Sequence, residues 1–324
     1  MIKAGIIGCG KIAGYYEKKI NPNTHAGAYL THDLFKLEVC YDIIKNKTIN
    51  FAKKYNCHFS KNLDEFLNTY SLDVVSVTTP DDTHYEILKK ILLNKIKPRI
   101  IFLEKPACET KNEFEEIIRL SKKYKVKVVV NLSRRFDELH NYLRNLIKRK
   151  TLGSFVSGIG TYYGGLKHNG VHLIDTLIYL LNENFIVLDV FGVINEEEIK
   201  DPTIEFRIKT IRKNRIISVF GFNEKQYQLF ELDLRFTKGR IRIEDFGTIL
   251  RIEKRFKNNI GENILKPHNV KIVKKNSSLI NALNIIAGHL LKNRDIKKYD
   301  IISTNKTMNL IWKIEDEYKI KFRA

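Results

Sequence analysis

The chain has 324 residues and a mass of 37.9 kDa, with 57 lysines and arginines against 37 aspartates and glutamates, a formal net charge of +20. At about 150 residues per domain, this length predicts two domains. The lysines are scattered through every segment, without a zinc knuckle or an RNP-type aromatic motif, so we expect no nucleic-acid partner. The positive field instead favours an anionic small substrate, such as a nucleotide-linked sugar.

Signals for membrane insertion and secretion are not evident in the sequence. The first apolar segment, Ile2 to Ile7, predicts a strand rather than a signal peptide, and no apolar run approaches the ~18 residues of a membrane span. The four cysteines, Cys9, Cys40, Cys57 and Cys108, have neither metal-type spacing nor the density of a disulfide framework. We therefore expect a cytoplasmic protein with no membrane contact and no metal site.

A glycine-rich turn follows the first strand. Gly8-Cys9-Gly10-Lys11-Ile12-Ala13 has the spacing of a dinucleotide-binding fingerprint, with alanine in the place of the third glycine. The first glycine permits a tight turn, the second lets the backbone approach a pyrophosphate, and the small third residue lets a helix pack on the strand. We expect the N–H groups at the start of the following helix to face the phosphates. That helix should break at Asn21-Pro22-Asn23, before a second short helix from His25 to Thr31.

The second strand, Lys36 to Tyr41, ends at Asp42. An acidic residue at this position of a dinucleotide-binding domain accepts hydrogen bonds from the adenosine ribose and repels a ribose phosphate. The sequence therefore predicts NAD rather than NADP as the preferred cofactor, although Lys45 and Lys47 nearby weaken the discrimination.

Strands and helices continue to alternate as far as residue 131. Apolar runs predict strands near 57–59, 73–77, 100–103 and 126–130, with helices over 45–55, from 63, over 85–94 and over 110–123. This alternation indicates an α/β fold, with a doubly wound parallel sheet in an N-terminal Rossmann domain over residues 1–131.

One of these strands ends in a candidate catalytic group. The apolar run Ile100 to Leu103 leads into Glu104-Lys105-Pro106, and the proline stops the strand because it has no N–H to donate. In an open parallel sheet, ligands bind beyond the carboxyl ends of the strands. Glu104 and Lys105 therefore lie where chemistry is expected, and a solvated ion pair in a loop is the alternative.

The pattern changes beyond Asn131. A helix is predicted from Arg134 to about Lys150, then a strand from Phe155 to Tyr163, then a loop that enters a helix ending near Leu181. Apolar and charged residues alternate over 204–209 and 230–236, which indicates an antiparallel sheet, and helices are predicted over 279–292 and 304–319.

Four markers in order give the whole chain a resemblance to the glucose–fructose oxidoreductase/inositol dehydrogenase family. They are the glycine turn, Thr79-Pro80 with His84, Glu104-Lys105-Pro106, and Gly170-Val171-His172-Leu173-Ile174-Asp175. The resemblance implies an NAD(P) domain followed by a substrate-binding and oligomerisation α/β domain over residues 132–324, with an open, largely antiparallel sheet. It implies a homodimer or homotetramer formed through that sheet, and a cis peptide before Pro106. Whether the last helix packs back on the first domain stays open.

The resemblance also implies which residues bind the cofactor. They are Gly8, Gly10, Lys11, Ile12, Asp42, Thr79, Pro80, His84, Glu104 and Lys105.

Two residues are predicted to be catalytic. Removing hydride from a carbinol requires the hydroxyl proton to leave as well, so a base with a pKa near neutrality must reach that oxygen. His172 meets this requirement without perturbation. Lys105 can stabilise developing alkoxide charge and relay the proton, and Glu104 either orients this lysine or contacts the cofactor.

The chain departs from the family pattern at one position. Many members have an aspartate four residues before the histidine, where this chain has His168. We expect His168 to contact the substrate rather than replace the missing base, with a solvated loop histidine as the alternative. Asp175 lies one helical turn beyond His172 and can supply a carboxylate on the same face, or serve only as a cap or an ion-pair partner.

Three further residues are predicted to bind substrate. Asn169 lies in the loop that starts at Gly164 and leads through His168 to His172, called the histidine loop below. Arg134 could bind a sugar phosphate through bidentate geometry or only pair locally. Tyr163 could stack on a sugar face. Strand alternation directs one of Tyr162 and Tyr163 toward the core.

The sequence therefore predicts an NAD-dependent enzyme that transfers hydride between a nicotinamide cofactor and a hydroxyl or keto group of a sugar. A nucleotide-linked sugar of a polysaccharide or glycan pathway is the expected substrate. Two alternatives stay open. One is an NAD-assisted glycosidase of the same fold, which would accumulate no NADH, and the other is a non-catalytic NAD-binding regulator.

Overall fold

The structure is a computed structural model that describes residues 1–194, 200–272 and 277–323. The chain forms two compact units, Met1–Phe136 with Asn276–Asn305 and Asp137–Lys275 with Lys306–Ala324. The penultimate helix thus belongs to the first unit and the last helix to the second. The expected division after residue 131 stays a prediction for the functional domains.

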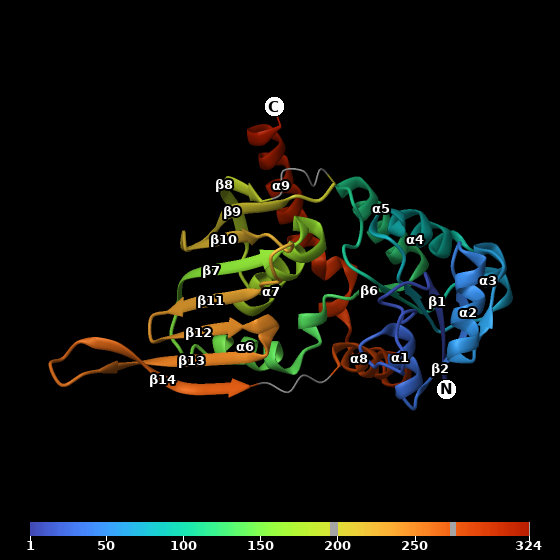
Figure 1. Ribbon diagram of the computed structural model, residues 1–324, viewed down its shortest axis with the longest axis horizontal. Coiled ribbons are helices and arrows are strands. Elements are labelled where there is room, and N and C mark those ends of the chain that lie inside the picture. The colour runs from blue at the N-terminus through green and yellow to red at the C-terminus, as the bar shows by residue number, and fades with distance from the viewer. Residues whose placement is uncertain (195–199, 273–276, 324) are drawn as a thin grey trace. The chain divides into compact units, whose positions relative to one another are not determined.

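The first unit is built on a six-stranded parallel sheet with the order β3-β2-β1-β4-β5-β6 (Figure 1). All residues of β4 and β5 are buried, which explains why their sequences read as unbroken apolar runs. The strands are β1 Ile2–Ile7, β2 Phe35–Tyr41, β3 His58–Phe59, β4 Val74–Val77, β5 Ile100–Leu103 and β6 Lys127–Val130. The helices are α1 His25–Thr31, α2 Lys45–Tyr55, α3 Leu63–Thr69, α4 His84–Leu93, α5 Lys111–Tyr124 and α8 Ser278–Lys292.

The helix expected directly after the glycine turn is not formed. Residues 11–16 adopt turns, and the first α-helix is α1, capped by the side chain of Thr24. Backbone bonds nevertheless join the turn to that helix, from His25 N–H to Ile12 O (3.1 Å) and from Ala26 N–H to Ala13 O (3.1 Å). Residues 14–24 are therefore an excursion that leaves and rejoins the start of α1. The prediction failed because Gly14 has φ +118°, a conformation outside the helical region.

Helix α8 completes the core of the first unit. Its residues Leu283 and Ile286 are fully buried in the same cluster as Ile6 of β1. The segment after α8 is bonded to a distant residue, since the buried Arg135 guanidinium donates to the carbonyl of Lys298 (2.8 Å) and the hydroxyl of Ser303 (2.6 Å). Arg135 thus serves the fold rather than a ligand.

The second unit contains an eight-stranded sheet with the order β14-β13-β12-β11-β7-β10-β9-β8 (Figure 1). Only the β7–β10 pair is parallel, so the predicted open, largely antiparallel sheet is confirmed. The strands are β7 Phe155–Tyr163, β8 Phe185–Ile194, β9 Thr203–Thr210, β10 Ile216–Phe222, β11 Glu231–Phe236, β12 Gly239–Glu244, β13 Ile249–Lys257 and β14 Asn263–Ile272. The helices are α6 Glu138–Lys148, α7 Val171–Leu181 and α9 Asn305–Phe322.

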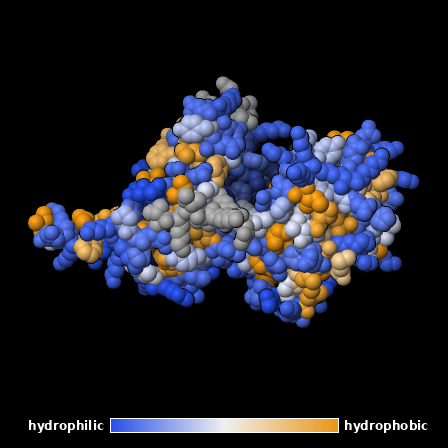
Figure 2. All heavy atoms as spheres, turned by 60° about the horizontal axis from the view of Figure 1, so that its bottom comes forward, coloured by the Kyte–Doolittle hydropathy of each residue, from blue (hydrophilic) through white to orange (hydrophobic). Residues whose placement is uncertain are grey.

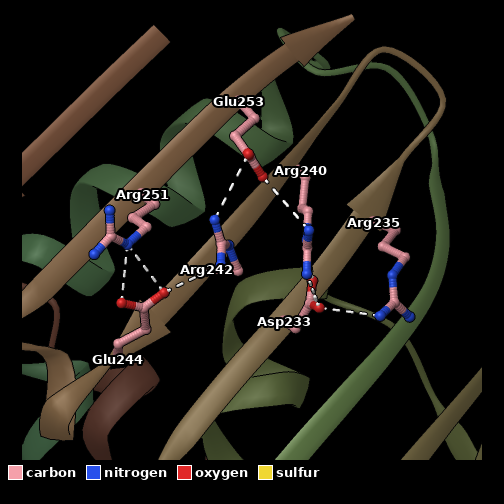
Figure 3. A network of polar contacts seen from close by, with 7 residues as sticks. All are labelled: Asp233, Arg235, Arg240, Arg242, Glu244, Arg251 and Glu253. Atoms are coloured by element: carbon pink, nitrogen blue, oxygen red, sulfur yellow. Dashed lines mark hydrogen bonds and ion pairs between the residues drawn. The ribbon is translucent and has the colours of Figure 1, made fainter. Parts of the chain in front are cut away.

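The two faces of this sheet differ in chemistry. Helix α7 packs against β7 and α6 on one face. The other face carries a network of ion-paired arginines and carboxylates on β11, β12 and β13 (Figure 3). In this network Asp233 accepts from Arg240 at 2.8 Å and Glu244 accepts from Arg251 at 2.9 Å. Alternation of apolar and charged residues along these strands therefore separates a packed face from a charged one.

The surface agrees with the dispersed charge of the sequence. One face of the molecule is mostly hydrophilic with smaller hydrophobic patches (Figure 2). Within the described ranges, no helix is long and apolar enough to cross a membrane.

Candidate functional site

The glycine turn has the geometry that a dinucleotide requires. Gly8 has φ +95°, and a Cβ on it would lie 2.7 Å from the carbonyl carbon of Thr78 and the amide nitrogen of Thr79. A Cβ on Gly10 would have a single neighbour within 4 Å, the Thr78 carbonyl oxygen at 4.0 Å. The protein therefore excludes a side chain at Gly8, whereas the space beside Gly10 is left to a ligand.

The residues after the two glycines form the rim of this turn. Lys11 and Ile12 are exposed and Ala13 is fully buried. Gly14 N–H and Tyr15 N–H both turn back to the carbonyl of Gly10, at 3.2 and 3.0 Å. The N–H groups available to a phosphate thus belong to this turn and not to a helix, which corrects the expectation from the sequence.

Asp42 is fixed at the end of β2. Its Oδ2 accepts from Cys9 N–H (2.8 Å) and its Oδ1 from Ile44 N–H (3.0 Å), while Lys47 Nζ lies 3.6 Å from Oδ2. Each oxygen keeps a lone pair for a further donor. The carboxylate therefore fits the hydroxyls of an adenosine ribose, and with the space beside Gly10 the first unit fits NAD(P).

The loop after β4 is tied to the loop after β5. The ring of His84 is fully buried, with Nδ1 2.7 Å from the carbonyl oxygen of Pro106 and Nε2 3.1 Å from that of Thr79. The Thr83 hydroxyl donates to the carbonyl of Pro80 and lies 2.7 Å from the hydroxyl oxygen of Thr79. His84 thus joins the two loops through backbone atoms, which supports a role in shaping the cofactor site rather than in direct contact.

A buried chain of polar side chains lies behind Lys105. His25 Nε2 lies 2.9 Å from Glu104 Oε1, and His25 Nδ1 lies 2.9 Å from Ser76 Oγ, which lies 2.7 Å from the hydroxyl of Tyr29. Asn131 Nδ2 donates to the same Glu104 oxygen at 2.6 Å. These five side chains come from α1, the strand β4 and the ends of β5 and β6, so the chain joins the start of the first helix to the carboxyl edge of the sheet.

This chain keeps Glu104 ionised. Burial alone would raise the pKa of Glu104, but the bonds from His25 and Asn131 and the charge of Lys105 lower it below its ordinary value. Glu104 is therefore a buried carboxylate whose neighbour, Lys105, is half-exposed at the end of β5. The Lys105–Pro106 peptide is cis, as predicted.

None of His25, Tyr29, Ser76 and Asn131 was identified from the sequence. His25 and Glu104 are 79 positions apart, and neither stretch has a pattern that pairs them. The only signal was the position of Ser76 and Asn131 near the ends of predicted strands.

The histidine loop of the second unit is held by a carboxylate that the sequence did not reveal. Gly164 and Gly165 have φ +58° and +82° and open a π-helical turn, Gly165–Gly170, ahead of α7. Asp201 accepts from the backbone N–H groups of Lys167 and His168, both at 2.8 Å. Burial raises the pKa of Asp201, against the lowering effect of these two bonds.

The histidine loop and the start of α7 expose some of the predicted side chains and bury others. His168 is exposed and His172 is half-exposed at the start of α7, whereas Asn169 donates to the carbonyl of Gly164 at 3.3 Å. Asp175 is buried, 2% exposed, and accepts from the hydroxyl of Thr307 on α9 at 2.8 Å. These positions favour substrate contact by the two histidines and a structural task for Asp175.

The remaining predicted residues fall into two groups. Tyr162 is fully buried and its hydroxyl bonds to the backbone of Ile204, whereas Tyr163 is half-exposed and packs edge-on against Phe246. Arg134 is half-exposed. Tyr163 and Arg134 thus remain candidates for substrate contact, and Tyr162 belongs to the core.

Comparison with known proteins agrees with this geometry. Residues 2–132 match the model of an oxidoreductase family with an NAD-binding Rossmann fold. Over these residues the chain is similar to that oxidoreductase family. The resemblance noted from the sequence motifs is therefore confirmed.

Individual relatives of this oxidoreductase are distant. A 2,7-anhydro-N-acetylneuraminate hydratase of Escherichia coli is 22% identical over 75% of this chain and 70% of its own length. A glucose-6-phosphate 3-dehydrogenase of Bacillus subtilis is 25% identical over 60% of this chain and 58% of its own length. The crystal structure of a 3-ketoreductase from Actinomadura kijaniata in complex with NADP has a TM-score of 0.79 at 14% identity, covering 98% of this chain and 97% of that one. The last likeness shows the fold, and the family shows an NAD(P)-binding oxidoreductase.

Proposed function

We propose that this oxidoreductase interconverts a hydroxyl and a keto group on a sugar, with Lys105 and His172 as its catalytic residues. The observation that supports this most is the buried chain through His25 and Glu104, which fixes the backbone that carries Lys105 at the carboxyl edge of the sheet. Ligands of open parallel sheets bind at that edge. A nucleotide-linked sugar is the first substrate class to test, because the chain carries a net charge of +20.

The roles of the protein groups follow from the chemistry of a carbinol. When bound, NAD(P) would accept or donate the hydride. The Lys105 ammonium donates a hydrogen bond to the substrate oxygen and stabilises the charge that develops on it. His172 takes the hydroxyl proton during oxidation and returns it during reduction, because an imidazole titrates near neutral pH.

NAD is the proposed preferred cofactor. The support is the Asp42 carboxylate, which would repel the phosphate of NADP. Lys47 Nζ, 3.6 Å from that carboxylate, offsets part of the repulsion, so we expect a modest preference.

A transient-oxidation enzyme is the second candidate. One relative is named as a hydratase, and adding water to a substrate involves no net oxidation or reduction. In that case Lys105 and His172 would serve the same proton transfers, and the product would form without accumulation of NADH.

We further propose a homo-oligomer formed through the open face of the second unit's sheet. That face combines the arginine–carboxylate set of Figure 3 with exposed aromatic residues, Phe191 and Phe220, which pack together on β8 and β10. Light scattering of the full chain tests this proposal.

The experiment that tests the function uses the full chain loaded with NAD. Nucleotide sugars, free sugars and inositols are screened for NADH formation and, by mass spectrometry, for products that form without it. Lys105→Ala should lower kcat by about 10²–10⁴ while NAD binding persists, and His172→Ala should do likewise. The double variant should be far from additive, since residues that act as a unit share one barrier reduction.

The matched control is Lys90→Ala, an exposed lysine in α4. It should leave kcat and NAD binding unchanged. If Lys105→Ala turns over as fast as Lys90→Ala, the proposed catalytic role of Lys105 is wrong.

A further inference from the structure

A basic cavity lies in the second unit, at the end of α7 opposite to His172. It has a volume of about 300 Å³ and is bordered by the last turn of α6, the start of β7, the end of α7 and the turn between β9 and β10. His172 and Leu181 are nine residues apart on α7, which places the cavity about 14 Å along the helix axis from the histidine. The cavity is therefore separate from the candidate catalytic loop.

The charges around this cavity have one sign. Its border contains three cations at the end of α6 and two on the β9–β10 turn, which are Arg144, Lys148, Lys150, Lys213 and Arg215. The single carboxylate on the border is Glu183. Between these charges the floor is apolar, formed by Ile147, Phe155 and Leu180.

A second cavity continues the same basic surface. It has a volume of about 480 Å³, shares the segment 181–183 with the first, and adds two further cations, Arg212 and Lys306. Seven positive side chains thus surround the end of α7 against one carboxylate. In the part of the chain that the structure describes, none of the seven forms an ion pair with an acidic side chain.

Helix ends explain only part of this concentration. The carbonyl groups at the ends of α6 and α7 attract cations, and Arg144 Nε does donate to the carbonyl of Tyr179 at 3.0 Å while its guanidinium lies over the Tyr179 ring. The cations of the β9–β10 turn belong to neither helix. Like charges held together without counter-charges destabilise a folded protein unless a ligand neutralises them.

We propose that this cavity binds a small ligand that carries two or more phosphate groups, and that it is distinct from the site of catalysis. Phosphate oxygens match lysine and arginine donors, and multiple phosphates match cations that come from separate elements. The concave shape and the apolar floor favour a small organic polyphosphate over an extended polyanion, because ligand cavities of about 300–1,000 Å³ enclose small molecules.

The test uses the full chain saturated with NAD, so that the dinucleotide site cannot bind the probe. Titration calorimetry measures the affinity for inorganic tripolyphosphate and for ATP. The variant Lys148→Gln with Lys213→Gln removes one cation from α6 and one from the β9–β10 turn, and should weaken binding of either probe by about tenfold or more. The control Arg255→Gln with Lys257→Gln removes two exposed cations from β13 of the same unit, and should weaken binding by less than about threefold.

Two further measurements test whether the variants are folded and whether the cavity prefers a small polyphosphate to an extended polyanion. Thermal unfolding of both variants shows whether they are folded, and each should match the parent within a few degrees because all four side chains are exposed. A single-stranded oligonucleotide is titrated as an extended polyanion. Equal weakening in the two variants, no binding of either probe, or an oligonucleotide that binds more tightly than tripolyphosphate would each overturn the proposal.

Discussion

Replacing His25 by alanine should destabilise the first unit, because it leaves the Glu104 carboxylate buried with Asn131 as its remaining described side-chain partner. Glu104 is 8% exposed and His25 is 1% exposed, so water cannot easily replace the lost bond. Removing a hydrogen-bond partner of a buried carboxylate costs about 3 kcal/mol. For a unit of 166 residues (136 and 30 in its two segments), 3 kcal/mol corresponds to a fall of roughly 6–12 °C in the unfolding midpoint.

The effect should depend on pH in a defined direction. In the parent protein the pKa of Glu104 lies below its ordinary value, so Glu104 contributes stability above that ordinary value and loses it as the pH falls through the folded-state pKa. Without His25, burial is opposed only by the bond from Asn131 and the charge of Lys105, so the pKa of Glu104 should rise relative to the parent. The ionised carboxylate then contributes less stability at neutral pH, and the gap in stability between parent and variant should narrow toward pH 4.

The assay is thermal unfolding of the full chain, followed at several pH values in the transition that NAD shifts upward. Glu115→Gln is the matched control, because it removes a carboxylate from an exposed ion pair with Lys111 and should leave the midpoint nearly unchanged. Combining His25→Ala with Glu104→Gln should cost much less than the sum of the single changes, since no buried charge then remains. An equal gap at pH 4 and pH 8, or full additivity, would refute the reasoning.

Four other changes test the two candidate sites. Asp42→Ala should weaken NAD binding and narrow the gap to NADP, measured by calorimetry; tighter NADP binding by the parent protein would contradict the proposed preference. Gly8→Ala should abolish dinucleotide binding or folding, because its Cβ would lie 2.7 Å from backbone atoms, and a fully active variant would disprove this. His168→Asn should raise KM more than it lowers kcat, whereas the reverse result would make His168 catalytic. Asp201→Asn should lower kcat/KM and remove an acid-side decline, because the pKa of Asp201 is raised and protonation starts above the ordinary aspartate range; an unchanged pH profile would count against a role in holding the loop.

Short-range patterns in the sequence predicted most of the fold. Unbroken apolar runs gave the buried strands β4 and β5, and period-2 alternation gave β9 and β11, because burial on one or two faces directly selects these residue types. The glycine turn and the loop before α7 were also identified from the sequence, because each is formed by residues that are adjacent in the chain.

The contacts that orient the site could not be read in this way. The pair His25 and Glu104, the bonds from Asp201 to the histidine loop, and the bond between Asp175 and Thr307 join positions that are 79, about 33 and 132 residues apart. No local periodicity encodes such pairs, because tertiary packing brings them together. The excursion after Gly14 was not predicted for a different reason. Its apolar and charged residues allow a helix, but the positive φ of Gly14 prevents a helix from continuing through that glycine.

The bonds that close this excursion also show how it relates to a shorter chain. His25 N–H and Ala26 N–H bond to carbonyls 13 positions earlier, nine more than the four of an α-helix. A chain without residues 16–24, in which Tyr15 is followed by His25, would therefore place both bonds in ordinary helical register. A helix that starts at the glycine turn would then be in phase with α1, with Gly14 in a helical conformation instead of the one it has here. The nine residues are therefore an addition before α1 that leaves His25 bonded to the carbonyl of Ile12.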